Sequence, residues 1–394
     1  MRLYLLGIFI ISSVMVIAQE NDSIVRYENT ADKLLKNNKG FTIGGYGQLD
    51  YNQPISSTTM NNGTLDVHRL VMLFGYNFNE HLKFVSEIEY EHVKEVFVEQ
   101  AFLQYKLNNY INLRGGLMLI PMGIINEYHE PPTFNGVERP MVDKYIAPTT
   151  WRELGLGITG NIIEASLKYQ LYVVNGFNGY DGNATLNGKN GLRKGRQKGA
   201  DSYISSPNFT GKVEYYGIRG LNIGLSGYLG KTQSTAYDKL ERNDDIAIKS
   251  ADSTVVGVSM VGLDLRYQLK GLALRGQLIY SSLDNTTAYN QKLSSDLGSE
   301  MIGYYAEVAY DVFSLTDKFK SQLIPFVRYE VYDTHSKVED NIVKNNAYYN
   351  TFITAGISWK ITPKVVVKSD YQFYKSNSDN EYSQMFNAGI GLMF

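Results

Sequence analysis

Residues 261–269 read V-G-L-D-L-R-Y-Q-L, and apolar and polar side chains alternate along the whole stretch. On a β-strand the apolar members would share one face and the polar members the other. A helix would spread the same apolar residues around its surface, so the pattern indicates a strand with one apolar and one polar face. Residues 163–173 and 221–229 show the same alternation.

The pattern continues from Phe41 to the end of the chain. It predicts sixteen strands: 41–51, 65–78, 82–92, 95–106, 110–120, 153–160, 162–174, 209–217, 220–231, 255–269, 271–282, 300–311, 321–332, 349–360, 364–374 and 384–394. Tight turns such as 79–81 and 107–109 alternate with long connections such as 123–152 and 175–208. An even number of strands near ten residues long, joined in this way, predicts an antiparallel transmembrane β-barrel.

A bilayer explains both the closure and the alternation. Unpaired backbone groups find no water in hydrocarbon, so a sheet that crosses a membrane closes on itself. The apolar face then points outward to lipid and the polar face lines the lumen. A pair of soluble β-sandwiches or a propeller would also alternate. Neither explains the asymmetry of the loops, and the sequence lacks the internal repeats of a propeller.

Composition narrows the function classes. The chain has 394 residues and no cysteine, which excludes disulfides, thiolate zinc sites and cysteine nucleophiles. The 38 Lys and Arg residues against 40 Asp and Glu leave no basic excess for a nucleic-acid partner. The 31 tyrosines fit the aromatic girdles of a membrane interface.

The first residues predict export. Met1-Arg2 and an apolar stretch to Ile17 precede Ala18, which is typical of a cleaved signal peptide over residues 1–18. The alternative is an uncleaved anchor, for which the apolar stretch is short. Residues 19–40 are polar and are interpreted as an exported N-terminal linker before the barrel of residues 41–394. They are expected to form either a short helix around Ala31–Lys36 or a mobile terminus.

The last strand carries a specific signal. Phe386, Ala388, Ile390, Leu392 and Phe394 form one apolar row, and the chain ends on Phe394. This resembles the C-terminal strand of bacterial outer-membrane proteins, whose terminal aromatic residue is read by the outer-membrane assembly machinery. The resemblance places the chain in the outer membrane of a Gram-negative bacterium, in contact with lipid and lipopolysaccharide.

A longer resemblance covers about 60 residues. Residues 98–105 (VEQAFLQY) are followed by 113–123 (LRGGLMLIPMG), by Glu138-Arg139-Pro140 and by 153–160 (ELGLGITG). This order resembles the phosphate-selective porin O and P family and its Bacteroidetes-type relatives. The resemblance implies a porin of 16 strands that assembles as a homotrimer, with the long third loop folded into the lumen.

One departure from that family concerns charge. Selective members line the pore with Arg and Lys, whereas Leu119 stands here where many members have Lys. Strand parity predicts the inward cations Lys83, Lys106, Arg114, Lys168, Lys212, Arg266, Arg275, Arg328 and Lys368. It predicts the inward anions Asp50, Glu87, Glu89, Glu91, Glu153, Glu164, Glu214, Asp264, Glu307, Glu330 and Asp370. Nine cations against eleven anions predict weak selectivity, because selectivity follows the charges that line a constriction.

Two loops carry the candidate selectivity residues. Constriction candidates lie on or beside the loop 123–152: Arg114, Glu127, Glu130, Glu138, Arg139, Asp143, Lys144 and Arg152. Residues 187–199 form a basic loop with Lys189, Arg193, Lys194, Arg196 and Lys198, which would raise the anion concentration at the mouth. Both loops have the alternative of being solvated surface loops. The basic loop has the further alternatives of binding lipopolysaccharide phosphates or a neighbouring subunit.

We therefore expect a porin that forms a water-filled channel for passive diffusion of small hydrophilic solutes and ions. An anion- or phosphate-selective porin and a non-conducting receptor or adhesin remain alternatives. The five histidines are scattered and no hydrolase or metal-binding spacing occurs, so neither an enzyme nor a cofactor or metal is expected. A plugged transporter would need more residues before the first strand than this chain has.

Overall fold

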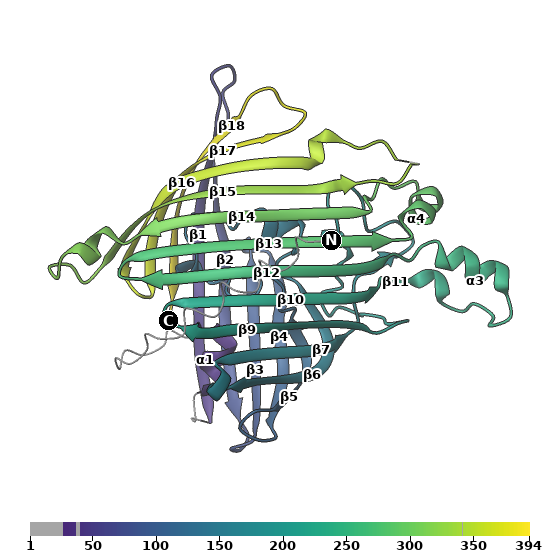
Figure 1. Cartoon of the computed structure of the whole chain (residues 1–394), viewed down its shortest axis with the longest axis horizontal. Coiled ribbons are helices and arrows are strands. Elements are labelled where there is room, and N and C mark those ends of the chain that lie inside the picture. Colours follow the sequence, from purple (N-terminus) through teal and green to yellow (C-terminus); the bar gives the residue numbers. More distant parts are fainter. Residues whose placement is uncertain (1–26, 37–39, 341) are drawn as a thin grey trace, which may run out of the picture.

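The computed structural model describes residues 27–36, 40–340 and 342–394. Sixteen antiparallel strands form one closed barrel, and β1 at the beginning pairs with β18 at the end (Figure 1). The predicted barrel and its strand number are confirmed. The predicted signal peptide, residues 1–18, lies outside the described residues.

Strand bounds agree with the alternation to within a few residues. The barrel strands are β1 (Phe41–Ile55), β2 (Thr64–Asn77), β3 (Leu82–Glu91), β4 (Glu95–Lys106), β5 (Asn112–Leu119), β6 (Arg152–Ile162), β7 (Leu167–Val174), β9 (Asn208–Ile218), β10 (Leu221–Lys231), β12 (Gly257–Leu269), β13 (Leu272–Asp284), β14 (Glu300–Tyr310), β15 (Gln322–Lys337), β16 (Tyr349–Thr362), β17 (Val365–Ser376) and β18 (Ser383–Met393). Two short strands, β8 (Asn178–Tyr180) and β11 (Gln233–Ser234), pair with each other outside the barrel.

Helices are short and lie in the connections and at the N-terminus. The α-helices are α1 (Thr30–Lys36), α2 (Val142–Tyr145), α3 (Asp245–Asp252) and α4 (Thr286–Leu293). The 3-10 helices are η2 (Pro131–Thr133), η3 (Ile163–Ala165), η4 (Arg193–Gly195), η5 (Thr235–Tyr237), η6 (Val312–Leu315) and η7 (Asn346–Tyr348). Among the described residues, none of the helices has the length and apolar character needed to span a membrane.

Two strand bounds differ from the prediction by five residues. The strand expected to end at 332, β15, continues to Lys337. The strand expected over 162–174 begins only at Leu167, because β6 continues to Ile162 and η3 then forms the turn. Ser166 closes that turn in the left-handed conformation, with φ of 52°. Glu164, predicted to face the lumen, is therefore exposed in the turn, and Lys106 is exposed at the end of β4. Strand parity does not hold where the chain leaves the sheet.

The two faces of the wall have the polarity expected in a bilayer. Apolar residues on the outer face stay exposed, for example Leu156 at 66% and Leu229 at 59%. Charged residues on the inner face are buried inside the barrel, including Lys212, Asp264 and Arg266. Lipid would cover the first group, and the barrel contents cover the second.

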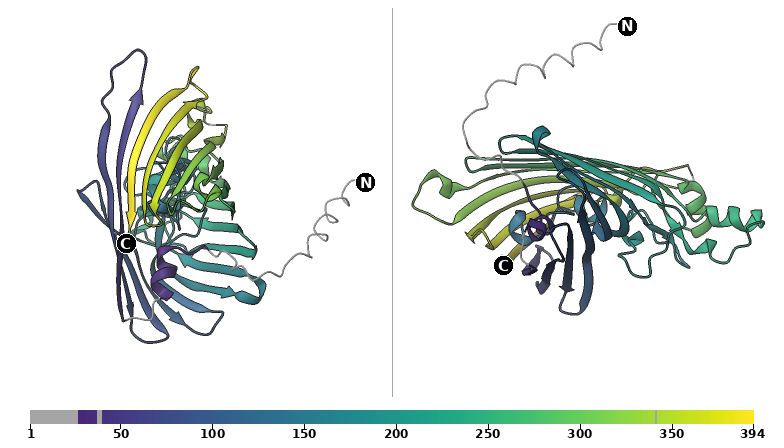
Figure 2. Two further views of the ribbon diagram at one scale, coloured as in Figure 1. Left: turned by 90° about the vertical axis from the view of Figure 1, so that its left-hand side faces the viewer. Right: turned by 90° about the horizontal axis from the view of Figure 1, so that it is seen from below.

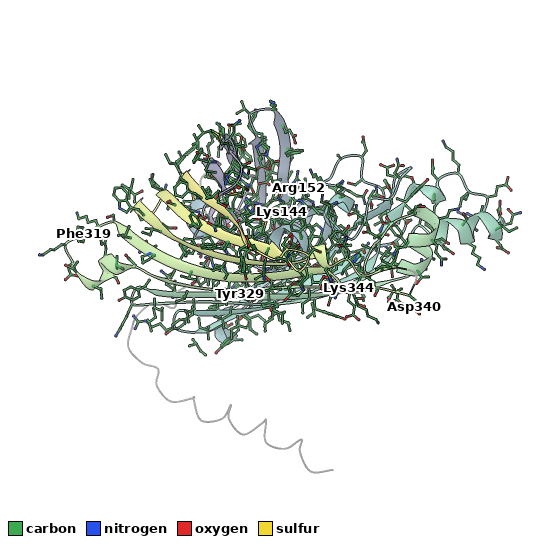
Figure 3. All side chains as sticks on the ribbon, turned by 90° about the horizontal axis from the view of Figure 1, so that it is seen from above. Lys144, Arg152, Phe319, Tyr329, Asp340 and Lys344 are labelled. Carbon is green, nitrogen blue, oxygen red and sulfur yellow. The ribbon has the colours of Figure 1, made fainter. Side chains whose placement is uncertain are left out.

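The strands are strongly tilted, so the strands of opposite walls cross each other in projection. In Figure 1 the strands from β9 to β17 run across the front, and the strands from β1 to β5 cross them steeply behind. Tilt of about 35–45° on opposite walls produces this crossing. Figure 3 shows the two ends: Phe319 lies in the connection from β14 to β15 at one end, and Asp340 and Lys344 lie in the connection from β15 to β16 at the other.

The N-terminal helix α1 packs against the inner wall beside β2 and β3. Leu34 of α1 lies against Gly75 of β2, where a Cβ atom would lie 3.4 Å from it. The Asp32 carboxylate pairs with Lys168 Nζ of β7 at 2.7 Å. Of the two alternatives for this segment, the short helix around Ala31–Lys36 is present, and part of the segment interpreted as a linker contacts the barrel interior (Figure 2).

Candidate functional site: an inner loop and a basic cavity

Residues 120–151, named here the inner loop, fill the lumen. The loop leaves β5 after Leu119 and returns at Arg152, and these two residues are paired neighbours in the sheet. Every residue from Pro121 to Pro132 is buried. The prediction that the long third loop folds into the lumen is therefore confirmed.

Wall side chains fix the first leg of the inner loop by its backbone. Lys212 Nζ of β9 donates to the Gly123 carbonyl at 2.7 Å, and the Ile124 amide donates to Gln277 Oε1 of β13 at 2.7 Å. Gly123 has φ of +71°, and a Cβ there would lie 2.6 Å from Gln277 Oε1. The glycine that ends Pro121-Met122-Gly123 is therefore needed for the turn and for the approach of the wall.

Further bonds fix the rest of the loop to other parts of the wall. Val137 N donates to Asp370 Oδ2 at 2.7 Å, Lys368 Nζ donates to Gly136 O at 2.8 Å, and Arg275 Nη2 donates to Thr133 O at 2.7 Å. These partners come from β13 and β17. The inner loop is consequently held from several sides of the barrel and narrows its interior.

A cavity of about 330 Å³ lies between the inner loop, strands β1 to β4 and the basic loop. Seven cationic side chains line it: Arg69, Arg139, Lys144, Arg152, Arg193, Arg196 and Lys198. Four acidic side chains line it: Glu89, Glu91, Glu138 and Asp143. We call this space the basic cavity, because its lining carries more positive than negative charge.

The basic loop is bonded to the inner loop. Arg193 Nη1 donates to the Thr149 carbonyl at 2.8 Å, and Arg196 Nη1 donates to the Pro148 and Thr150 carbonyls at 3.0 and 3.1 Å. Burial, with Arg193 nearby, lowers the pKa of Arg196 to about 9, so Arg196 remains a cation at neutral pH. Two loops far apart in sequence therefore build one wall of the basic cavity.

Lys198 and Arg152 meet over one aromatic ring. Lys198 Nζ lies 4.6 Å and the Arg152 guanidinium carbon 5.5 Å from the ring centre of Phe97 on β4. Ring faces attract cations, so Phe97 helps to hold two like charges close together. Figure 3 shows Lys144 near Arg152 in the middle of the molecule, and both line the basic cavity.

Asp143, on the inner loop, is an acidic group of the cavity that titrates near neutral pH. Gln277 Nε2 donates to its Oδ1 at 2.9 Å. Burial raises the pKa of Asp143 to about 7, although that hydrogen bond and the nearby Arg328 and Arg139 oppose the shift. The charge of the cavity lining therefore changes near neutral pH.

Several sequence candidates lie outside the basic cavity. Glu127 accepts from Gln170 Nε2 at 2.6 Å and lies 3.5 Å from Lys212 Nζ, so it ties the inner loop to the wall. Arg114 bonds to Gln104 and Tyr172. Glu130 is buried in the inner loop, and Lys189 and Lys194 are exposed in the basic loop. The structure thus gathers Glu138, Arg139, Asp143, Lys144, Arg152, Arg193, Arg196 and Lys198 and leaves the other five apart.

His129 joins the inner loop to the opposing wall below the basic cavity. Its Nε2 lies 3.3 Å from Glu87 Oε1 of β3 and 3.3 Å from Glu99 Oε2 of β4. Burial disfavours the imidazolium, but Glu99 and Glu87 outweigh it and raise the pKa of His129 to about 10. Arg139 Nη2 donates to the His129 carbonyl at 3.2 Å, which connects this cluster to the cavity lining.

Sequence parity missed a buried charge on each of the two strands β2 and β4 that line the basic cavity. Arg69 is on β2, where Leu70–Leu73 is apolar on both faces because the inner face packs in the hydrophobic core. Glu99 is the extra residue of a bulge, since Glu87 pairs with Gln100 and Ile88 with Val98. Because residues 70–73 do not alternate, strand parity could not assign Arg69 to the inner face. Nothing in the sequence marks the bulge that buries Glu99.

Several solved structures are similar to this fold over most of the chain. The anion-selective porin from Comamonas acidovorans is similar with a TM-score of 0.57 and 13% identity over 90% of this chain and 99% of that chain. Salmonella typhi OmpF, in a complex with daunomycin, and the outer membrane channel DcaP of Acinetobacter baumannii both have a TM-score of 0.58. They are 13% and 10% identical over 90% of this chain and 97% of each of theirs, so they establish the porin fold alone.

Sequence comparison gives a relative that matches over most of its length. No family model matches the chain. An uncharacterized protein of Aquifex aeolicus (strain VF5) is 34% identical over 384 residues, covering 92% of this chain and 82% of the relative. The chain therefore belongs to the same family as this Aquifex protein, and its fold is the 16-strand barrel of the outer-membrane porins.

Proposed function

We propose that the chain is an outer-membrane porin that passes small hydrophilic solutes and ions by passive diffusion, without enzymatic activity. The observation that carries the proposal is the inner loop, which crosses a closed 16-strand barrel and leaves a charged cavity beside it. A narrowed polar lumen is what a diffusion channel needs to filter solutes by size and charge. The proposed location is the outer membrane of a Gram-negative bacterium, reached by way of a cleaved signal peptide.

The basic cavity favours a second, more specific function, an anion-preferring channel. Its seven cations and four acids concentrate positive charge at one level of the lumen. Such a field raises the local concentration of anions and their rate of entry. The resemblance of residues 98–160 to the phosphate-selective porin O and P family makes phosphate one anion to test, as a blocker of chloride current.

The assembly that we propose is a homotrimer surrounded by lipid and lipopolysaccharide. Planar-bilayer recording of the detergent-purified protein tests both the channel and the assembly. A trimeric porin is expected to give stable conductance steps in multiples of three. A folded, heat-modifiable barrel that gives no steps would contradict the channel and favour the receptor or adhesin alternative.

The pKa of Asp143 gives a pH-dependent prediction. Because its pKa lies at about 7, lowering the pH removes one negative charge from the basic cavity. Lowering the pH from about 8.5 to about 5.5 should raise the chloride-to-potassium permeability ratio about twofold. Reversal potentials across a KCl gradient measure it. Because other titratable side chains also line the cavity, Asp143→Asn should reduce this pH dependence and not abolish it. A variant that keeps the full pH dependence would refute the assignment.

Phe394 is proposed as the signal for membrane assembly. Its amide donates to the Gly45 carbonyl at 2.8 Å, and its side chain is 60% exposed. Removing an exposed ring leaves the backbone pairing intact, so Phe394→Ala should lower the amount of folded barrel in the outer membrane about tenfold while folding into detergent in vitro remains normal. Heat-modifiability on gels measures the folded fraction in the outer membrane and in detergent. Equal loss in both settings would show a structural role instead.

A further inference from the structure

Three buried side chains from three separate elements converge between the inner loop and the wall: Glu87 of β3, Glu99 of β4 and His129 of the inner loop. One ligand-type atom from each lies within 4.8 Å of the others. We infer that these residues bind a divalent transition-metal ion, with Zn²⁺ as the best match, which fastens the inner loop to the barrel wall. The inference does not depend on the proposed ion preference of the channel.

The two distances from His129 to the potential carboxylate ligands fit a small tetrahedral ion, and the two carboxylate oxygens lie within 4.8 Å of each other. His129 Nε2 lies 3.3 Å from Glu87 Oε1 and 3.3 Å from Glu99 Oε2. Ligands bound at about 2.1 Å in a tetrahedron stand about 3.4 Å apart. One nitrogen and two carboxylate oxygens are ligand types that Zn²⁺ accepts, and three protein ligands leave its fourth position open.

The charge of the cluster also calls for a cation. Among the described residues, the only basic group within 4.0 Å of either Glu87 or Glu99 is His129. Within this trio, a protonated imidazole leaves one net negative charge, which the more distant Arg69 and Arg152 offset in part. A divalent ion with a neutral imidazole leaves no net charge within the trio. Buried charges are least costly when their compensation is close, so a divalent ion is a suitable counter-charge.

Glu99 is a second and independent sign of a missing partner. Its side chain is fully buried, and Oε1 accepts no hydrogen bond from an amide, hydroxyl or basic group of the described residues, because its side-chain neighbour is another carboxyl group, that of Glu89. Oε2 lies 3.3 Å from Tyr46 Oη, whose hydroxyl proton serves Glu87 Oε1 at 2.7 Å. A bulge in β4 buries Glu99 beside Gln100. Bulges often aim side chains at functional sites, and an unsatisfied buried carboxylate needs an explanation.

The surrounding residues orient the ligands as they do in metal sites. His129 Nδ1 lies 3.2 Å from the Asn126 carbonyl, an acceptor, so Nδ1 keeps its proton when a metal ion displaces the proton of Nε2, which is directed at the carboxylates. Gln100 Nε2 donates to the other oxygen of Glu87 at 2.7 Å. Such partners fix the tautomer and the orientation of ligands and increase metal affinity.

Metal binding by the folded, detergent-purified full chain tests the inference. After treatment with a chelator, the protein is titrated with ZnCl₂ and followed by calorimetry and elemental analysis. We expect one Zn²⁺ per chain, with the affinity at least about 100-fold weaker in both His129→Gln and Glu99→Gln. The matched control is His335→Gln, because His335 is a buried histidine bonded to the Asp296 carbonyl and distant in the fold. This control should bind Zn²⁺ like the wild type.

Two results would overturn the metal site. One is wild-type binding that is no stronger than that of His129→Gln; the other is loss of binding in His335→Gln to the same extent. If either cluster variant does not fold, X-ray absorption of the Zn²⁺-loaded wild type decides instead. One imidazole with oxygen ligands supports the site, and an all-oxygen or multi-histidine shell rejects it. Channel conductance does not enter this test, so failure here leaves the porin proposal standing.

Discussion

Replacing Lys144 and Lys198 by glutamate is expected to turn an anion-preferring channel into a cation-preferring one. Both side chains line the basic cavity, and the double change converts its lining from seven cations and four acids to five and six. Lys144 is exposed and Lys198 is half-buried, so both positions tolerate a carboxylate. Because selectivity follows the charges at a constriction, the chloride-to-potassium permeability ratio should fall about five- to tenfold and pass below unity.

The same loop offers a matched control for this reversal. Lys189 and Lys194 are exposed in the basic loop but do not line the cavity. The double variant Lys189→Glu and Lys194→Glu changes the net charge by the same amount, and its permeability ratio should stay close to that of the wild type. Reversal potentials of the three proteins under one KCl gradient measure the effect. Equal shifts in both double variants would assign selectivity to overall charge and not to the cavity.

Removing the inner loop is expected to raise single-channel conductance severalfold. Leu119 and Arg152 are paired across β5 and β6, and Ile120 N bonds to Trp151 O at 3.0 Å, so the two legs already form a hairpin stem. Replacing residues 122–149 by Asn-Gly would close this stem with a two-residue turn. The wall keeps all sixteen strands, and the lumen loses the segment that fills it. Conductance in a planar bilayer should rise by about three- to fivefold, with ion preference close to neutral.

A deletion elsewhere controls for a general effect of shortening loops. The connection from β11 to β12 contains α3 (Asp245–Asp252), which lies beyond the barrel (Figure 1). Deleting residues 240–250 from this connection should leave conductance and ion preference unchanged. If the barrel without residues 122–149 folds and conducts no more than the wild type, then the inner loop does not limit the pore.

Alternation predicts most of this fold because each face of the barrel wall has its own requirement. Lipid requires apolar residues on the outer face, and the filled polar lumen requires polar residues on the inner face. The strands β9, β10, β12 and β13 therefore keep a strict period of two and are predicted almost to the residue. The prediction of which side chains face the lumen fails where a segment leaves the sheet or where the inner face is not polar. The turn at Ile163–Ala165 leaves the sheet, and the inner face of β2 is apolar at Val71 and Leu73.

The candidate site was only partly predictable for a different reason. Strand parity gives the number of inward charges but not their level along the barrel, so near-equal totals hid a local excess of cations. The basic cavity depends on two loops: Arg193 and Arg196 bond to carbonyls of the inner loop from the β7–β9 connection. The closed wall brings these two loops together. The alternation of residues along the sequence carries no information about such contacts.

The reversal potential of the wild-type protein across a KCl gradient in a planar bilayer tests the central claim most directly. An inner loop that narrows the lumen beside the basic cavity predicts stable conducting steps with chloride favoured over potassium. Steps that favour potassium would contradict the role given to the cavity. A folded barrel that forms no conducting steps would contradict the channel itself.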